Sequence, residues 1–170
     1  PGAYLGSCRY KLPESLEDPV YPKLFRKFEE MNIGWFFYIG GNDSMDTVSK
    51  LSRYAAQIKS PIRFIGIPKT IDNDLWGTDM TFGFHSAVEV ATDTIDRIHT
   101  TATSHNRVFI IEIMGHKVGW LTLYAGVAGG ADIILLPEIP YDIEKVIAAI
   151  NKRTKAGKGF TILAVAEGAI

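Results

Sequence analysis

The stretch Gly66-Ile67-Pro68-Lys69-Thr70-Ile71-Asp72-Asn73-Asp74 decides the fold of this chain and directs the search for its function. It follows an apolar run at residues 62–67, which predicts a buried strand. The strand leads directly into a lysine, a threonine and two carboxylates spaced two residues apart. Taken alone, such a stretch is equally compatible with an ordinary polar loop. Because the other predicted strands also end in glycine or acidic residues, we interpret it as part of a site.

Four further apolar runs predict strands, and segments with apolar residues at helical spacing separate them. The predicted strands are residues 34–39, 62–67, 107–113, 133–136 and 160–166, and the predicted helices include residues 22–31, 82–101 and 143–154, the last with Asp142 as its N-cap. Strands that alternate with helices and are almost entirely apolar indicate an α/β fold with parallel sheets covered on both faces. We therefore expect doubly wound, Rossmann-like three-layer sandwiches, in which ligands bind at the carboxyl ends of the strands.

The composition excludes several classes of partner. The 170 residues are 46% hydrophobic and 22% charged, with a net charge of −1, so the chain lacks the basic surplus of proteins that bind nucleic acid or anionic membranes. Its apolar runs are too short to span a bilayer. A single cysteine, Cys8, allows no internal disulfide, which fits the cytoplasm as the expected location.

The segment Gly40-Gly41-Asn42-Asp43-Ser44 follows the strand predicted at residues 34–39 and opens a helix. Glycine lets a phosphate approach the backbone, and a helix N-terminus favours an anion. A plain tight turn capped by Ser44 or Asp43 is the alternative. A carboxylate at Asp43 suits a phosphate site only if a divalent cation bridges the two.

Lys69, Thr70, Asp72 and Asp74 supply a cation, a hydroxyl donor, a candidate general base and a candidate metal ligand. Phosphoryl transfer to an alcohol depends mainly on positioning and charge stabilisation, and these side chains provide both. In this interpretation Asp72 accepts the proton of the attacked hydroxyl.

Residues at two more strand ends are weaker candidates. Met114 and Glu167 follow predicted strands and are placed to line a sugar, although a methionine is also common core filler and a glutamate a common surface acid. His116 has no second histidine or cysteine at metal-ligand spacing. Arg107 precedes its strand, so a functional role for it requires a neighbouring subunit.

Together these motifs resemble the 6-phosphofructokinases in order and spacing over essentially the whole chain. The matching segments are Leu5-Gly6-Ser7-Cys8-Arg9, Gly40-Gly41-Asn42-Asp43-Ser44, Pro68-Lys69-Thr70-Ile71-Asp72-Asn73-Asp74, Ser104-His105-Asn106-Arg107, Met114-Gly115-His116-Lys117-Val118-Gly119-Trp120 and Ala166-Glu167-Gly168. The resemblance implies a phosphofructokinase-like fold. Residues 1–75 would form the second part of a phosphate-donor-binding domain, and residues 76–170 a sugar-phosphate-binding domain incomplete at both ends.

The resemblance also implies roles for single residues. Asp72 is the expected general base for the 1-hydroxyl of fructose 6-phosphate, supported by Thr70 and Asp74. The remaining expected contacts are Arg9, Gly41, Asp43, Ser44 and Lys69 to the phosphate donor, Met114, Gly115, His116 and Glu167 to the sugar phosphate, Arg107 to the sugar phosphate of an adjacent subunit, and Asn42 and Asp74 to Mg²⁺. We therefore expect a homo-oligomer whose site is shared between subunits.

Donor choice depends on two of these positions. ATP-dependent members usually carry glycine at the positions of Asp43 and Lys69, whereas pyrophosphate-dependent members resemble this chain. A carboxylate at Asp43 repels a nucleotide α-phosphate, and Lys69 neutralises compact pyrophosphate. We therefore expect pyrophosphate as donor, with ATP as the alternative.

Two positions depart from the family pattern. Asn42 replaces an aspartate associated with the metal, and His116 replaces an arginine; these changes are compatible with a divergent subgroup, an altered donor or sugar, or reduced activity. A catalytically weak regulatory paralogue that binds phosphosugar is therefore an alternative function. An unrelated nucleotide-binding domain would show GxGxxG, which is absent. We expect the chain to be an internal piece of a longer protein that carries the activity.

Overall fold

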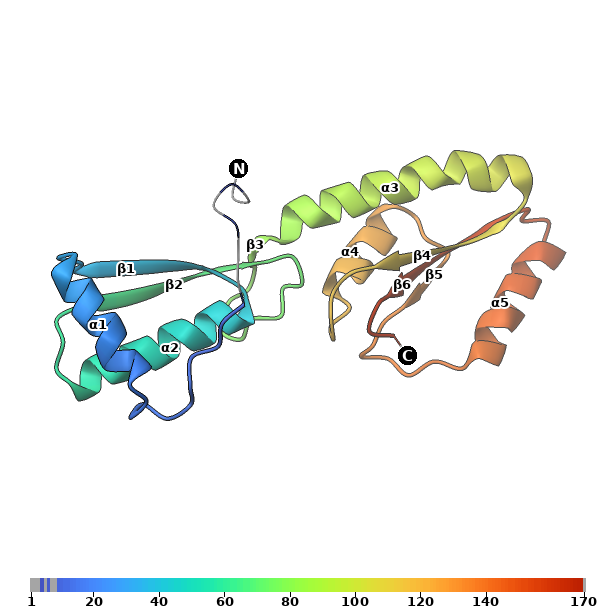
Figure 1. Cartoon of the computed structure of the whole chain (residues 1–170). Coiled ribbons are helices and arrows are strands. Elements are labelled where there is room, and N and C mark those ends of the chain that lie inside the picture. The colour runs from blue at the N-terminus through green and yellow to red at the C-terminus, as the bar shows by residue number, and fades with distance from the viewer. Residues whose placement is uncertain (1–3, 5, 7–8, 170) are drawn as a thin grey trace. The chain divides into compact units, whose positions relative to one another are not determined.

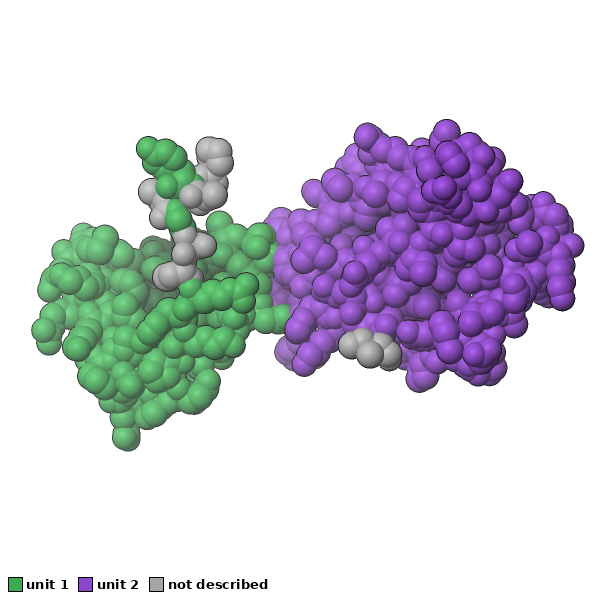
Figure 2. Space-filling view, turned by 45° about the vertical axis from the view of Figure 1, so that its right-hand side comes forward, with its two compact units in different colours: residues 1–69 green, residues 70–170 purple. Residues whose placement is uncertain are grey.

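The computed structural model describes residues 4, 6 and 9–169. The chain forms two compact units, residues 1–69 and 70–170, coloured separately in Figure 2. The division falls between Lys69 and Thr70 rather than after residue 75, so Thr70, Asp72 and Asp74 all belong to the second unit. The roles expected for the two domains stay predictions.

The first unit contains α1 (Val20–Glu30), β1 (Trp35–Gly40), α2 (Asn42–Gln57) and most of β2 (Arg63–Thr70), shown in Figure 1. β1 and β2 are parallel and pair from Trp35↔Arg63 to Gly40↔Pro68. They belong to a sheet of order β1-β2-β3, in which β3 is the two-residue strand Phe82–Gly83.

Aromatic side chains form the core of the first unit. The ring centroids of Phe25 in α1 and Tyr54 in α2 are 4.9 Å apart. Those of Phe36 and Phe64, on adjacent strands, are 5.7 Å apart. Since side chains alternate along a strand, the neighbours of Phe36 point to the opposite face. Trp35, on that opposite face, is 63% exposed, whereas Phe36 and Phe64 pack against α1 and α2. Within the described residues, the helices therefore cover only one face of β1 and β2.

The second unit contains α3 (Phe84–His105), β4 (Val108–Ile113), α4 (Trp120–Ala128), β5 (Ile133–Leu135), α5 (Ile143–Lys155) and β6 (Thr161–Ala166). Its three-stranded sheet is parallel with the order β4-β6-β5. Ile162 and Ala164 pack with α3 and α4, whereas Thr161 accepts a hydrogen bond from Arg153 of α5. Helices therefore lie on both faces of this sheet (Figure 1). The expected α/β class with parallel sheets is confirmed.

One predicted boundary near the site is wrong. β2 does not end at Ile67 but continues through Thr70. Its pairing with β1 reaches Pro68, and β3 is its neighbour on the other side in the sheet. After β4, a turn closed by the Val118 N–H and the Gly115 carbonyl comes before α4. By contrast, Asp142 is the N-cap of α5, and its Oδ1 accepts from Glu144 N at 2.9 Å, as predicted.

Among the described residues, no helix combines the length and the hydropathy needed to cross a membrane.

Candidate active site

The parallel pairing of β4 with β6 brings Glu167 to the turn that follows β4. Ile113 and Ala166 are partners in the ladder, so the residues that follow them are neighbours at the carboxyl edge of the sheet. Glu167 N–H donates to the carbonyl of Ile113 at 3.0 Å. The structure therefore brings Met114, Gly115 and Glu167 together, as the strand-end argument predicts.

Glu167 holds the backbone of this turn. Its Oε1 accepts from Gly115 N at 3.0 Å and also from His116 N. The two backbone donors lower the pKa of the Glu167 carboxyl below its ordinary value because they stabilise the charged form. Glu167 is therefore an ionised group that shapes the turn, in addition to its expected contact with substrate.

Glycine is required at two points of this turn. A Cβ on Gly115 would overlap the Val118 carbonyl oxygen, and a Cβ on Gly168 would overlap the carbonyl oxygen of His116. His116 itself has φ 53°, a left-handed conformation uncommon for a residue with a side chain. The backbone here is packed too tightly for side chains, which explains the glycines in the Met114-Gly115-His116 and Ala166-Glu167-Gly168 motifs.

Asp72 lies half-buried in the same unit, and its pKa is raised above the ordinary aspartate value. Burial is the main cause, and the negative charge of Asp74 adds to it; Glu167 contributes in the same direction. A hydrogen bond from the Thr70 hydroxyl and the nearby His116 act in the opposite direction. A carboxylate with a raised pKa is a stronger base, which suits the expected proton transfer.

Asn73 and Thr81, to which the sequence analysis gave no role, hold the loop that carries Asp72. Asn73 bonds to Asp79 and Thr81 through its side chain, and the buried Thr81 donates from its hydroxyl to the Thr70 carbonyl at 2.7 Å. The one available signal was the position of Asn73 between two aspartates, since asparagine tolerates left-handed backbone better than most residues.

In the first unit, Gly41, Asn42, Asp43 and Ser44 lie at the carboxyl end of β1, as predicted. Gly41 is the N-cap of α2, and no side chain in the described residues caps this helix start, so the alternative in which Asp43 or Ser44 caps it is wrong. Ser44 packs against Gly40, where a Cβ would overlap its hydroxyl.

Asp43 has an ion-pair partner that the sequence did not indicate. Lys11 Nζ lies 3.1 Å from Asp43 Oδ1, and both side chains are exposed. The neighbouring Leu12 is held by Lys50, whose ammonium donates to the Leu12 carbonyl at 3.1 Å and pairs with Asp46 and Glu14. Hydrogen bonds to Asp46 and Glu14 raise the pKa of Lys50 to about 12. Lys50 thus anchors the segment that presents Lys11 to Asp43.

Three other predicted residues lie at the surface. Lys69 is exposed in β2, directly before Thr70. Arg9 is exposed, whereas Leu5, Ser7 and Cys8 of its motif lie outside the described residues. Arg107 is exposed at the amino end of β4, the opposite end of the strand from Met114, so the structure does not bring it to the Asp72 cluster of its own unit.

The expected Mg²⁺ was tested against the available ligands. Within residues 4, 6 and 9–169, no three His, Cys, Asp or Glu side chains gather as a metal-binding group. Mg²⁺ commonly takes only one or two protein oxygens and completes its shell with water and substrate phosphate. Each unit offers one expected oxygen ligand of this kind: the amide oxygen of Asn42, which carries no charge, in the first unit, and the carboxylate of Asp74 in the second.

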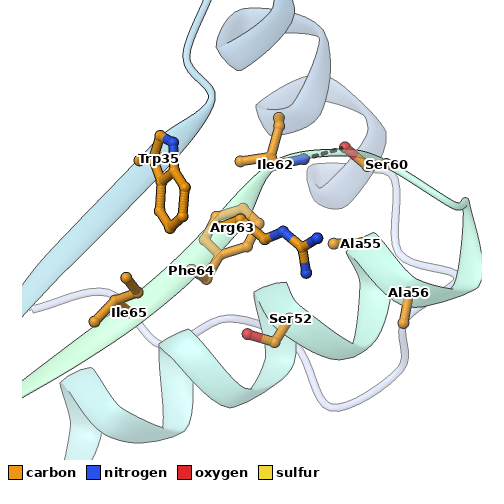
Figure 3. A pocket seen from close by; sticks show the side chains of 9 residues that line it. All are labelled: Trp35, Ser52, Ala55, Ala56, Ser60, Ile62, Arg63, Phe64 and Ile65. Carbon is orange, nitrogen blue, oxygen red and sulfur yellow. Dashed lines mark hydrogen bonds between the residues drawn. The ribbon is translucent and has the colours of Figure 1, made fainter.

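Two cavities of similar size lie beside the strands. One of about 530 Å³ in the second unit is lined by Ile71 and Met114 and so adjoins the predicted site. The other, of about 570 Å³, lies in the first unit between α2 and β2 and is shown in Figure 3. Its lining includes Trp35, Ser52 and Arg63 but no predicted site residue, so we locate the chemistry at the strand ends and not in this cavity.

The chain matches the family model described as Phosphofructokinase over residues 1–170. It is 50% identical over 147 residues to the ATP-dependent 6-phosphofructokinase of Spirochaeta thermophila, covering 86% of this chain and 38% of that protein. It is 47% identical over 171 residues to ATP-dependent 6-phosphofructokinase 3 of Bacteroides thetaiotaomicron, covering 98% and 49%.

Solved structures of pyrophosphate-dependent enzymes are also similar. The phosphofructokinase of Marinobacter aquaeolei has a TM-score of 0.83 at 37% identity, covering 98% of this chain and 43% of that one. The enzyme of Nitrosospira multiformis has a TM-score of 0.85 at 34% identity, covering 96% and 42%. The chain spans less than half the length of each of these four relatives. Because the family model spans all 170 residues and the relatives cover most of them, the chain belongs to the phosphofructokinase family.

Proposed function

We propose that the full-length protein containing this chain transfers a phosphoryl group from pyrophosphate to the 1-hydroxyl of fructose 6-phosphate, giving fructose 1,6-bisphosphate. The observation that carries the proposal is the cluster of Thr70, Asp72, Asp74, Glu167 and the turn at Gly115. In this cluster the carboxylate of Asp72, whose pKa is raised, lies near a hydroxyl donor, Thr70, and near the ionised carboxylate of Glu167.

In this proposal Asp72 accepts the proton of the 1-hydroxyl as the oxygen attacks phosphorus, while the P–O bond to the leaving phosphate breaks. Thr70 donates to the Asp72 carboxylate and orients it. Met114, Gly115, His116 and Glu167 bind the sugar phosphate. Asn42 and Asp74 would hold Mg²⁺, which would supply positive charge to neutralise the phosphates of the donor.

Asp43 and Lys69 support pyrophosphate as the donor. A carboxylate at the start of α2 repels the α-phosphate of a nucleotide, and Lys69 adds charge for a small, highly charged donor. The exposed pair of Asp43 with Lys11 weakens the repulsion only slightly, since exposed pairs interact by about 0–1 kcal/mol. Two structural relatives are themselves pyrophosphate-dependent.

ATP is the second candidate donor because the relatives quoted above from Spirochaeta thermophila and Bacteroides thetaiotaomicron, at 47–50% identity, are both named ATP-dependent. The identity with the two pyrophosphate-dependent enzymes is lower, at 34–37%. Overall identity and the two donor-specific positions thus favour different donors, and a direct assay separates them.

The test follows phosphorylation of fructose 6-phosphate by the full-length protein with Mg²⁺, offering pyrophosphate and ATP in separate reactions. We expect turnover with pyrophosphate. Turnover with ATP alone would contradict the donor assignment and leave the reaction class intact. No turnover with either donor, from protein that binds fructose 6-phosphate, would instead favour a regulatory paralogue, with Asn42 and His116 as the responsible positions.

A further inference from the structure

The residues between β2 and β3 form a loop without helix or strand, from Ile71 to Thr81. Trp76 at its tip is 101% exposed, and Asp79 and Met80 are exposed as well. Exposed loops of this kind are mobile unless specific bonds hold them. Asp72 is carried by this loop, yet a general base must stay within hydrogen-bond reach of the proton it accepts. The loop therefore needs a device that fixes Asp72.

The side chain of Asn73 provides such a device. Its Oδ1 accepts from Thr81 N at 2.8 Å, and its Nδ2 donates to the Asp79 carbonyl at 3.2 Å. Turning the amide round would place an NH₂ group against the Thr81 N–H, so the bonding pattern allows one orientation. One side chain thus joins the beginning of the loop to its end.

Thr81 links the end of the loop to Thr70 and to α3. It is 3% exposed, and its hydroxyl lies 2.7 Å from the Thr70 carbonyl and 3.2 Å from Asn73 Oδ1. A hydroxyl has one proton, and the shorter contact identifies the Thr70 carbonyl as its acceptor. The carbonyl of Thr81 accepts from Phe84 N at 3.2 Å, which ties the loop end to the start of α3.

The backbone conformation of Asn73 also helps to fix the position of Asp72. Its φ of 55° is left-handed, so the chain turns sharply between Asp72 and Asp74. Asp72 N–H in turn donates to Thr70 Oγ1 at 3.2 Å. Bonds from Thr70 and Asn73 therefore hold the peptide of Asp72 on both sides.

We infer that Asn73, acting through Thr81, is a positioning residue that fixes the Asp72 carboxylate for proton transfer. We call the bonds of Asn73 to Asp79 and Thr81, with the Thr81–Thr70 bond, the Asn73 clamp. The catalytic consequence rests on the proposed function; the effect of the clamp on the Asp72 carboxylate does not. Neither Asn73 nor Thr81 needs to touch the substrate.

The test compares Asn73→Gly with the wild type in the full-length protein. Glycine keeps the left-handed backbone and removes the amide. We expect kcat to fall by about 10–100-fold with less than about a threefold change in the KM for fructose 6-phosphate, because misplacement of a reacting group costs turnover more than binding. Thr81→Val should act in the same direction, and Thr81→Ser, which keeps the hydroxyl, should restore turnover.

The split between kcat and KM, together with rescue by Thr81→Ser, distinguishes positioning from mere destabilisation. A variant that only unfolds more easily loses activity in proportion to the unfolded fraction, so its kcat per folded molecule keeps the wild-type value. Asn32→Gly is the matched control, since Asn32 is exposed, has φ 54° at the end of α1, and lies outside the site.

Two measurements decide the inference independently of turnover. Amide exchange at Asp72 and amide exchange at Thr81 should both become faster in Asn73→Gly and not in Asn32→Gly. If both stay at wild-type values, or if kcat per folded molecule stays within about twofold of wild type, the inference is overturned. A wild-type protein without turnover would contradict the proposed function alone, and the exchange at these two amides would still decide the clamp.

Discussion

The carboxyl group of Asp72 is held where its charged form is disfavoured. Burial and the charge of Asp74 raise its pKa, and the hydrogen bond from Thr70 only partly offsets them. The charged form is the one that accepts a proton, so the same environment that strengthens the base also weakens the folded state at neutral pH. This conflict at a single residue leads to opposite effects of one substitution on turnover and on stability.

Asp72→Asn should lower kcat by about 10²–10⁴ with a modest change in KM, as expected when a general base is removed. Steady-state kinetics of the full-length protein measure this effect. Near-normal turnover in the variant would exclude Asp72 as the base. In the wild type, kcat should fall as the pH drops through the raised pKa of Asp72, because the protonated acid accepts no proton.

The same substitution should raise the Tm at pH 7. With a folded-state pKa above the unfolded one, the stability linked to Asp72 is fully present below the unfolded pKa, about 4, and is lost as the pH rises through the folded pKa. Asparagine carries no charge to bury, so the gain should appear at pH 7 and vanish below about pH 4. Calorimetry at both pH values checks the sign; a lower Tm of the variant at pH 7 would contradict it.

The proposed donor choice also depends on single residues. Replacing Asp43 and Lys69 together by glycine should lower kcat/KM for pyrophosphate, since the charge that neutralises a compact donor is removed. Lys59→Gly is the control for loss of one lysine, because Lys59 is exposed in a turn with φ 54°, which glycine adopts easily. Unchanged pyrophosphate kinetics in the double variant would refute the donor argument.

At the scale of the element, the helices differ in how their ends are held. Asp142 caps α5 with a side-chain bond to Glu144 N, whereas α2 begins at Gly41 without such a cap. A capped start stabilises its helix, and an uncapped start leaves a helix N-terminus open to an anion. The contrast matches the roles proposed for the two helices, one structural and one at the donor site.

Asp142→Ala should therefore lower the free energy of unfolding by about 0.5–2 kcal/mol, the usual cost of losing an N-cap. Asp93→Ala is the matched control, since Asp93 forms an exposed pair with Arg97 one turn along α3 at 2.8 Å. Such pairs contribute about 0.3–0.5 kcal/mol. Urea unfolding of both variants measures the difference, and equal effects would argue against the cap.

At the scale of the whole molecule, the role expected for Arg107 requires a second subunit. It lies at one end of β4 and Met114 at the other, and the six residues of the strand between them span about 20 Å. Within one subunit, the strand thus separates the arginine from the proposed sugar site at Met114. We expect Arg107→Ala to raise the KM for fructose 6-phosphate.

Mixing two defective proteins tests the shared site. Asp72→Asn and Arg107→Ala subunits, unfolded together and reassembled, should form hybrids with one intact site, which takes Asp72 from one subunit and Arg107 from the other. Random pairing predicts recovery of about a quarter of wild-type turnover. Activity no greater than the sum of the separate variants would show that Arg107 acts within its own subunit.

The α/β class, the helices and most strand ends were predictable from the sequence, because they depend on local periodicity and on turn residues. Asp142 was recognisable as a cap, since capping joins residues adjacent in the chain. A site at the Thr70-Ile71-Asp72-Asn73-Asp74 motif was also predictable, because the carboxyl ends of parallel strands meet at one edge of a sheet, where ligands bind.

Only the tertiary structure showed which residues hold that motif in place. The extension of β2 beyond Ile67 depends on its pairing with neighbouring strands, and the hydrogen bond between Glu167 and the Gly115 turn depends on the register of β4 with β6. The bonds of Thr81 depend on how the loop closes. Each joins groups that become neighbours only when the chain has folded, so no local pattern specifies them.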